Sequence, residues 1–244
     1  MTIRINNVEI QYEIHRKKVK NMTLRIKSDG KVIVTANNRI SRIHIEEFIK
    51  NKANWILTKL EKVKNTIKLG KDMLNIKENE SILILGKECK LKLFQSEVNK
   101  VEIIENSIYI YCKDILEEAN INHAFNSWLK KYTKSMMEEQ LKSSMKMFNA
   151  YLIANGYSNY NEELPVLRIR GMKSRWGSCM VNKRMITLNA YLIHTPLSCI
   201  EFVMFHELVH LIHPNHSKDF YYALSMLLPD HLERNKHLNQ YTLI

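Results

Sequence analysis

The sequence predicts an α+β fold, in which a β-rich region with one helix (residues 1–112) is followed by a mainly helical region (residues 113–244). Apolar and polar residues alternate through much of the first region, which is the period of a half-buried strand. From residue 113 onward, apolar residues recur every three or four positions, as on one face of a helix. The chain of 244 residues is long enough for two modest domains, and we expect their boundary at this change of period.

The first strands and their helix follow from short patterns near the N-terminus. Residues 8–14 alternate between apolar and polar side chains, and further strand patterns follow as far as Val34. Ser41 is placed to cap a helix whose apolar stripe begins at Ile45. Trp55 belongs to that stripe, so we expect it to be an anchor of the core.

The pattern changes from strands to a long helix in the middle of the chain. Short strands are expected between residues 81 and 112, and they belong with the first region. Residues 113–154 are helical in period, with large side chains such as Phe125 and Phe148 on one face. Asn155-Gly156 then predicts the end of this helix, because glycine readily takes the left-handed conformation found there. The sequence shows no internal repeat.

The second region is expected to contain three short strands and two further helices. The strands are expected at residues 166–169, 175–179 and 185–188. Thr195 is placed to cap, and Pro196 to open, a helix that is almost entirely apolar. Ser217 is placed to cap the next helix.

The chain carries a net charge of +12, from 37 basic and 25 acidic side chains. Such an excess permits a nucleic-acid partner. However, the lysines are spread through the whole chain, and no helix-turn-helix, zinc-finger or RNA-binding aromatic motif is present. The composition therefore does not indicate nucleic-acid binding, and it says nothing of the oligomeric state.

Hydropathy and cysteine usage predict a cytoplasmic protein without a membrane partner. No apolar run approaches the length of a membrane span, and the first residues alternate like a strand, unlike a signal sequence. Cys89, Cys112, Cys179 and Cys199 are scattered and form no CxxC pair. We therefore expect reduced thiols and no disulfide framework.

The segment His206-Glu207-Leu208-Val209-His210 predicts a zinc site with its own general base. Because His206 and His210 are four residues apart, a helix places both imidazoles on one face, where they can hold one ion. Glu207 lies beside the first ligand, where its carboxylate can take a proton from a metal-activated water. The surrounding residues are otherwise apolar, so burying these polar groups would be costly without a metal.

Pro214 helps to choose the third ligand. On an unbroken helix, His213 would lie on the same stripe as His206 and His210. Proline disfavours helical geometry at the preceding residue and lets the chain turn back. We therefore favour His216, on the returning segment, as the third ligand of a Zn²⁺ ion.

The ligating histidines need hydrogen-bond partners for their free ring N–H groups. Asn189 and Asp219 are the candidates for this role. Each also has a simpler explanation, Asn189 as a strand-end cap and Asp219 as a charge at a helix start. The sequence leaves both explanations open.

Two blocks of sequence near the C-terminus resemble a known family. The first is KSRWGSC (Lys173–Cys179), followed by ITLN (Ile186–Asn189), and the second is HELVHLIHPNHSKDF (His206–Phe220). Together and in this order, they resemble the YgjP-like family of zinc-dependent metallopeptidases. That family is similar to the SprT-type and WLM-type metalloproteases and belongs to the zincins. The resemblance covers most of the chain.

The resemblance implies a zincin-like metallopeptidase domain over residues 113–244, with a small three-stranded sheet packed on the metal helix. It implies that His206, His210 and His216 bind Zn²⁺ and that Glu207 is the catalytic carboxylate. The activity it implies is hydrolysis of peptide bonds in a protein or peptide substrate. The family does not define which substrate is cut.

The segment before the metal helix is expected to line the cleft, through Arg175, Trp176, Gly177, Ser178 and Cys179. A strand edge there can pair with an extended substrate backbone. Alternatively, Trp176 simply packs on the metal helix. Cys179 has no paired base in the sequence, so we do not expect it to act as a nucleophile.

Two other functions stay open at this point. One is a zinc amidohydrolase that acts on a small amide, which a closed pocket would favour. The other is a DNA- or protein-binding module with a structural zinc. An intact Glu207 counts against the second, because a structural zinc needs no general base.

Overall fold

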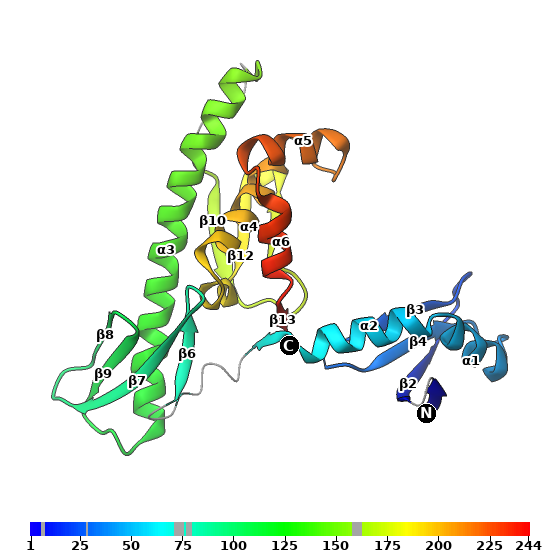
Figure 1. Ribbon diagram of the computed structural model, residues 1–244. Helices are drawn as coiled ribbons and strands as arrows, with labels where there is room; N and C mark the ends of the chain where they lie inside the picture. Colours follow the sequence, from blue (N-terminus) through cyan, green and yellow to red (C-terminus); the bar gives the residue numbers. More distant parts are fainter. Residues whose placement is uncertain (6–7, 28, 71–75, 77–79, 158–162) are drawn as a thin grey trace. The chain divides into compact units, whose positions relative to one another are not determined.

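The computed structural model describes all 244 residues except 6–7, 28, 71–75, 77–79 and 158–162 (Figure 1). The fold is α+β, as the sequence predicts, with several small sheets and six α-helices among the described residues. The chain forms two compact units, one of Met1–Lys68 with Ile244 and one of Leu69–Leu243. Within the described part of the chain, no helix is both long and apolar enough to cross a membrane.

The first unit is a four-stranded sheet with two helices. The strand order is β1-β2-β4-β3, and only the central β2–β4 pair is parallel. Its elements are β1 (Thr2–Ile5), β2 (Val8–Arg16), β3 (Thr23–Ile26), β4 (Val32–Ala36), α1 (Arg42–Asn51) and α2 (Ala53–Lys64). Buried apolar residues of the strands and both helices form one core.

The expected helix cap is confirmed, but the predictions of a single helix and of a buried Trp55 are wrong. The Ser41 side chain accepts a hydrogen bond from the His44 backbone N–H. Lys52 leaves helical geometry and separates α1 from α2. Asn51 and Asn54 flank this break, and asparagine side chains compete with the helical hydrogen bonds of the backbone. Trp55 is 44% exposed, because the buried face of α2 is formed by its neighbours.

The second unit begins with another four-stranded sheet, which packs on a long helix. Its elements are β6 (Ser81–Ile84), β7 (Lys87–Gln95), β8 (Lys100–Ile104), β9 (Ser107–Cys112) and α3 (Glu118–Ala154). Figure 1 shows this sheet beside the N-terminal half of α3, and Phe125 and Leu129 of that helix share a core with the strands. This shared core explains why the compact units divide after Lys68, earlier than the boundary that we expected at residue 112. The end of α3 at Asn155-Gly156 is as predicted.

The two sheets are copies of one topology, which the sequence did not reveal. The second sheet has the order β6-β7-β9-β8, and again only its central pair is parallel. Ile3 pairs with Ile10 in the first hairpin, as Ile82 pairs with Cys89 in the second. The long strands β2 and β7 also share one pattern of buried and exposed positions. In each copy a helix follows the fourth strand, so we call residues 2–64 the first module, and β6–β9 with the N-terminal half of α3 the second module.

The remainder of the second unit surrounds the apolar helix α4. A three-stranded sheet of order β10-β12-β11 lies beside it, and three helices pack on it. The elements are β10 (Val166–Arg170), β11 (Gly177–Met180), η2 (Val181–Lys183), β12 (Met185–Asn189), η3 (Ala190–His194), α4 (Leu197–Val209), α5 (Lys218–Leu227) and α6 (His231–Leu238). Two short strands, β5 (Ile67–Leu69) and β13 (Tyr241–Leu243), complete the elements.

Two details at the ends of α4 differ from our expectations. The helix begins at Leu197 with Pro196 as its N-cap residue, and the Thr195 hydroxyl donates to the Leu192 carbonyl, so it does not cap α4. The regular helix ends at Val209, several residues before Pro214. Tighter turns continue beyond it, so the chain has already left the helix when it reaches the proline.

Candidate metal centre

Helix α4 holds the candidate site within the core of the second unit. Most of its residues are buried, and α3, β11, β12, α5 and α6 all contact it. Such a helix is fixed on nearly every side, so the side chains at its C-terminal end have little freedom to move. His206 and Glu207 lie on its last turn, and His210 follows as its C-cap residue.

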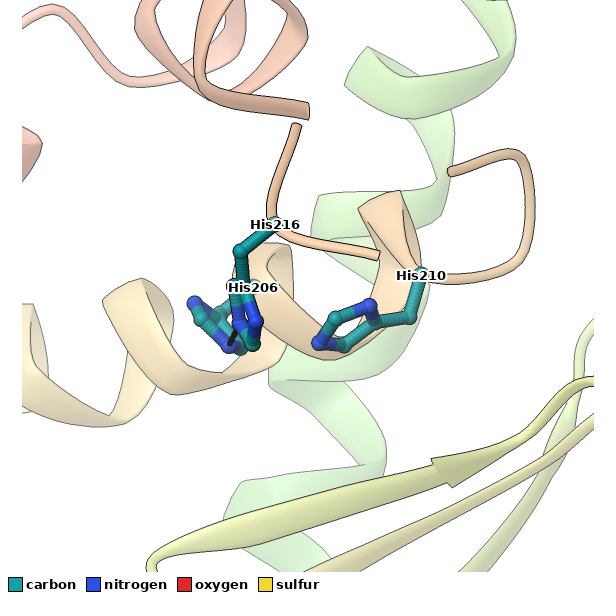
Figure 2. Close-up of side chains that lie close together, drawn as sticks. All are labelled: His206, His210 and His216. Atoms are coloured by element: carbon teal, nitrogen blue, oxygen red, sulfur yellow. Dashed lines mark hydrogen bonds between the residues drawn. The ribbon is translucent and has the colours of Figure 1, made fainter. Parts of the chain in front are cut away.

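Figure 2 shows the rings of His206, His210 and His216 converging from the end of α4 and from the loop that leads to α5. One ring nitrogen of each histidine lies within 4.8 Å of the other two. The ring centroids are 4.7 to 4.9 Å apart, and the Nε2 atoms of His206 and His216 are separated by 2.9 Å. This arrangement brings together the three histidines that the sequence predicted as ligands.

The other candidate for third ligand, His213, faces a different neighbour. Its Nε2 atom lies 3.3 Å from the Tyr157 hydroxyl, and the two rings meet edge to face. The backbone carbonyl of His213 instead forms a hydrogen bond with one of the three clustered histidines, because the Nδ1 atom of His210 lies 3.2 Å from it. A carbonyl only accepts, so His210 carries its proton on Nδ1 and keeps the lone pair of Nε2 for a metal.

Phe220, from the first turn of α5, forms an apolar floor beneath the three histidines. Its ring centroid is 5.0 Å from that of His206 and 4.7 Å from those of His210 and His216. The Ser217 side chain caps α5 as predicted, accepting a hydrogen bond from the Phe220 N–H, and so fixes this ring. Sequence reasoning missed the role of Phe220, although the residue lies three positions after the cap.

The protonation of the histidines suits a metal ion. Burial, and then the neighbouring His210 and His216, lower the pKa of His206 to about 4. Burial also lowers the pKa of His210, although the hydrogen bond to the His213 carbonyl acts in the opposite direction and raises it. Both rings are therefore neutral near pH 7, and a neutral imidazole has a lone pair to donate to a metal.

Glu207 lies beside this cluster as a buried carboxyl group. It is only 4% exposed, and burial raises its pKa to about 8, although the positive charge of Arg175 opposes the shift. Among the described residues, nothing forms a hydrogen bond with its buried Oε2 atom. A divalent cation on the three histidines would offset the cost of this buried charge. The residues present therefore fit a divalent metal ion.

Gly177 gives Glu207 the space it occupies. A Cβ atom on Gly177 would lie 2.5 Å from Oε1 and 2.8 Å from Cγ of Glu207, closer than real atoms approach. Gly177 is the first residue of β11, so this strand passes directly over the carboxylate. The sequence predicted Gly177 as part of the cleft, but the need for a glycine here follows only from the structure.

Two hollows meet at Gly177, His206 and Glu207. The first, of about 420 Å³, lies toward His210 and His216 and is also lined by Arg175, Ser178 and Cys179. The second, of about 270 Å³, is mostly apolar and extends between α4, α5 and α6 past Trp176. The five residues that we expected in the cleft, 175–179, are thus divided between both hollows.

The structure bears on two questions from the sequence, namely whether Trp176 lines the cleft or packs on the metal helix, and whether Cys179 can act as a nucleophile. Trp176 packs against the core around α4 and also lines the apolar hollow, so it fits both descriptions. Burial, with the nearby Glu207 charge, raises the pKa of the Cys179 thiol to about 12. The thiol therefore stays protonated at neutral pH, which agrees with the expectation that it is no nucleophile.

Asn189 and Asp219 have roles other than support of the histidines. The fully buried Asn189 side chain donates to the carbonyls of Met172 and Arg175 and accepts from the Met172 and Tyr191 N–H groups. It thereby holds the turn that leads into β11. Asp219 is exposed in the first turn of α5, which is the simpler of its two explanations.

Helix α6 is tied to α4 by a group of charges that the sequence analysis did not identify. The Arg234 guanidinium donates to Glu201 on α4 and to both carboxylate oxygens of Asp230, the latter at 2.8 Å. Arg234 is mostly shielded from solvent, where such paired contacts are stronger than on an open surface. This group keeps α6 in place as one wall of the apolar hollow.

Comparison with protein families places the chain among the metallopeptidases. Residues 20–241 match the YgjP-like family, described as the YgjP-like metallopeptidase domain. The chain belongs to this family, which confirms the resemblance seen in the two C-terminal blocks.

Two solved structures are similar over part of the chain. One is the metallopeptidase zymogen of Pyrococcus abyssi abylysin, at 19% identity and a TM-score of 0.35, covering 44% of this chain and 99% of that one. The other is the metallopeptidase zymogen of Methanocaldococcus jannaschii jannalysin, at 20% identity and a TM-score of 0.31, covering 40% and 94%.

Proposed function

We propose that this chain is a zinc-dependent peptidase in which His206, His210 and His216 hold the ion and Glu207 is the general base. One observation carries the proposal: three histidine nitrogens within 4.8 Å of one another lie beside a buried carboxyl group. Three neutral histidines are a ligand set typical of catalytic zinc sites. When bound, zinc would polarise the substrate carbonyl and acidify a water molecule.

Glu207 would move the proton in this reaction. Its carboxylate accepts a proton from the water whose oxygen attacks the peptide carbonyl carbon, and then passes that proton to the nitrogen as the C–N bond breaks. Gly177 leaves the carboxylate free to reach the water, and burial in an apolar core keeps the side chain from turning away. Proton transfer of this kind contributes roughly a hundredfold to ten-thousandfold to the rate.

The substrate would be an extended peptide that pairs with β11. This strand is at the edge of its sheet, pairs with β12 alone within that sheet, and passes over Glu207. An added strand gains affinity from backbone hydrogen bonds and depends little on sequence. The hollows on the two sides of Glu207 would take side chains before and after the cut bond, which favours a peptide over a small amide.

Glu207→Gln tests the general base and the metal site together. The variant keeps the size of the side chain and should bind zinc as the unchanged chain does, while cleavage of casein falls at least about a hundredfold. Glu233→Gln, an exposed change on α6, is the matched control and should retain full cleavage. Full cleavage by Glu207→Gln would refute the assignment of the base, and absence of zinc from both proteins would refute the metal site.

A further inference from the structure

In the second module, a groove between the edge strand β6 and helix α3 holds a segment of the chain. The backbone N–H of Leu85 donates to the Ile193 carbonyl at 2.7 Å. The Nδ1 atom of His194 lies 2.7 Å from the Leu83 carbonyl, to which it donates. Ile193 is 1% exposed and belongs to the same core as Leu129 of α3. The groove therefore binds a peptide segment through an apolar side chain and the edge of a strand.

The first module has the same groove, because the two modules share strand order and register. The hairpin pairing gives Arg4 and Ile5 the places of Leu83 and Ile84. The buried helix positions Ile45 and Ile49 correspond to Ile121 and Phe125, which gives Lys50 and Ala53 the places of Asn126 and Leu129. In the second module, Leu83 and Leu129 of this set lie at the segment that contains Ile193. In the first module, Arg4, Ile5, Lys50 and Ala53 line a hollow of about 670 Å³.

This first-module groove is lined by exposed cations together with a few apolar side chains. Its lining includes Arg4, Lys50 and Lys52 as exposed cations, whereas the other described lining residues are uncharged. Ile5 and Ala53 also line it, and both are buried. Trp55 is 44% exposed and offers its ring at the edge. Ala53 takes the place of Leu129 and has a smaller side chain, so it leaves more room in this groove than Leu129 leaves in the groove of the second module.

We propose that the first-module groove binds an extended peptide segment that presents an apolar side chain next to acidic residues. The apolar side chain takes the place of Ile193, and the carboxylates face Arg4, Lys50 and Lys52. A peptide fits better than a nucleic acid, because the second module fills this groove with protein and because Ile5, Ala53 and Trp55 are among the lining residues of the first-module groove. This binding site is separate from the candidate metal centre and goes beyond the proposed peptidase activity.

A direct binding measurement tests this site without relying on cleavage. The full chain carrying Glu207→Gln is titrated into a fluorescently labelled peptide that has one isoleucine between glutamates. The same peptide with lysines for glutamates, or with glycine for isoleucine, should bind at least about tenfold more weakly. Binding of the acidic peptide should also weaken with added salt, because exposed charges are screened.

Matched variants locate the binding. Lys50→Glu with Lys52→Glu should weaken binding about tenfold or more, whereas Lys59→Glu with Lys62→Glu, an equal change on the exposed part of α2, should not. Trp55→Ala should weaken it about fivefold, and the exposed Ile43→Ala should leave it unchanged.

Three results would overturn the proposal. The first is failure of the acidic peptide to bind, and the second is equal binding by the groove variants and their controls. The third is groove-dependent binding of a labelled single-stranded oligonucleotide that is tighter than binding of the peptide. None of these results depends on whether the histidine cluster hydrolyses peptides, so each is distinct from a failure of the proposed function.

Discussion

The end of α4 and the two sheet modules depend on their sequences in opposite ways. Around α4, single side chains decide the arrangement: three histidines converge, and one glycine makes room for Glu207. In the modules, two sequences without visible similarity build one strand order and one register. Alternating burial is enough to specify the sheets, whereas the site needs particular atoms. Changes at the site should therefore reduce zinc binding or cleavage and leave the stability of the fold unchanged. Changes in the modules should reduce stability and leave zinc binding unchanged.

The largest effect is expected at the three histidines. Replacing His206, His210 or His216 by alanine removes one of three ligands, and zinc affinity should fall more than about a hundredfold, beyond the loss typical for outer partners. His213→Ala, whose ring faces Tyr157, should keep the metal. Zinc content after dialysis measures both. If His213→Ala lost zinc and His216→Ala retained it, His213 and not His216 would be the third ligand.

The next effect is expected at Gly177. In Gly177→Ala, the new methyl group would lie 2.5 Å from Glu207 Oε1, so the carboxylate or β11 must move. A displacement of about 1 Å at a catalytic group can cost on the order of a hundredfold in rate, so kcat should fall by about that factor. Zinc content should not change.

Gly171→Ala is the control for this change, because its added Cβ would have an ordinary contact of 3.6 Å with Tyr191. Peptide cleavage by the two variants and the unchanged chain gives the comparison. Equal cleavage by all three proteins would show that the close approach of β11 to Glu207 is unimportant.

In the second module, the loss should be of stability. Ile193→Ala opens a cavity in the core that joins β6 to α3, and such a change costs about 2 to 5 kcal/mol. Ile43→Ala on α1, where the side chain is 69% exposed, should stay within about 0.5 kcal/mol. Urea unfolding measures both, and zinc content should be unaffected. A loss of zinc from Ile193→Ala, with stability unchanged, would reverse the distinction between the two regions.

The smallest effect is a pH dependence at His194. Burial lowers the pKa of His194, although its hydrogen bond to the Leu83 carbonyl acts in the opposite direction and raises it. Above the unfolded pKa of about 6.5, the ring is neutral in both states and the folded chain has its full stability. As the pH falls below 6.5, the unfolded chain binds a proton that the folded chain does not, so stability is lost.

Unfolding in urea at pH 7.5 and pH 5.5 reveals this dependence. The loss of stability between the two values should be smaller in His194→Gln than in the unchanged chain, because glutamine does not titrate. Equal losses in both proteins would mean that His194 does not contribute to the acid sensitivity of the fold.

Much of the site was predictable from the sequence because its signals are local. The four-residue spacing of His206 and His210, and the effect of Pro214 on the favoured third ligand, depend on neighbours in the chain. The caps Ser41 and Ser217 were predictable for the same reason. The site assignments themselves stay predictions until metal binding and activity are measured.

What sequence reasoning missed depends on contacts between distant residues. Phe220 lies under the histidines, and Gly177 lies over Glu207, only because separate elements meet at α4. The repeated module was invisible because different apolar residues satisfy the same burial pattern. Trp55 was misplaced because the buried face of α2 runs through its neighbours Ala53 and Ile56, and the sequence did not reveal the break at Lys52 where this helix begins.

Returning zinc to the chelated chain while following casein cleavage tests the central claim most directly. If His206, His210 and His216 hold a catalytic ion, cleavage should be absent without metal and should rise until about one zinc ion per chain is bound. The same titration of His206→Ala should give no rise. Cleavage that is equally fast before and after zinc is added would contradict the account.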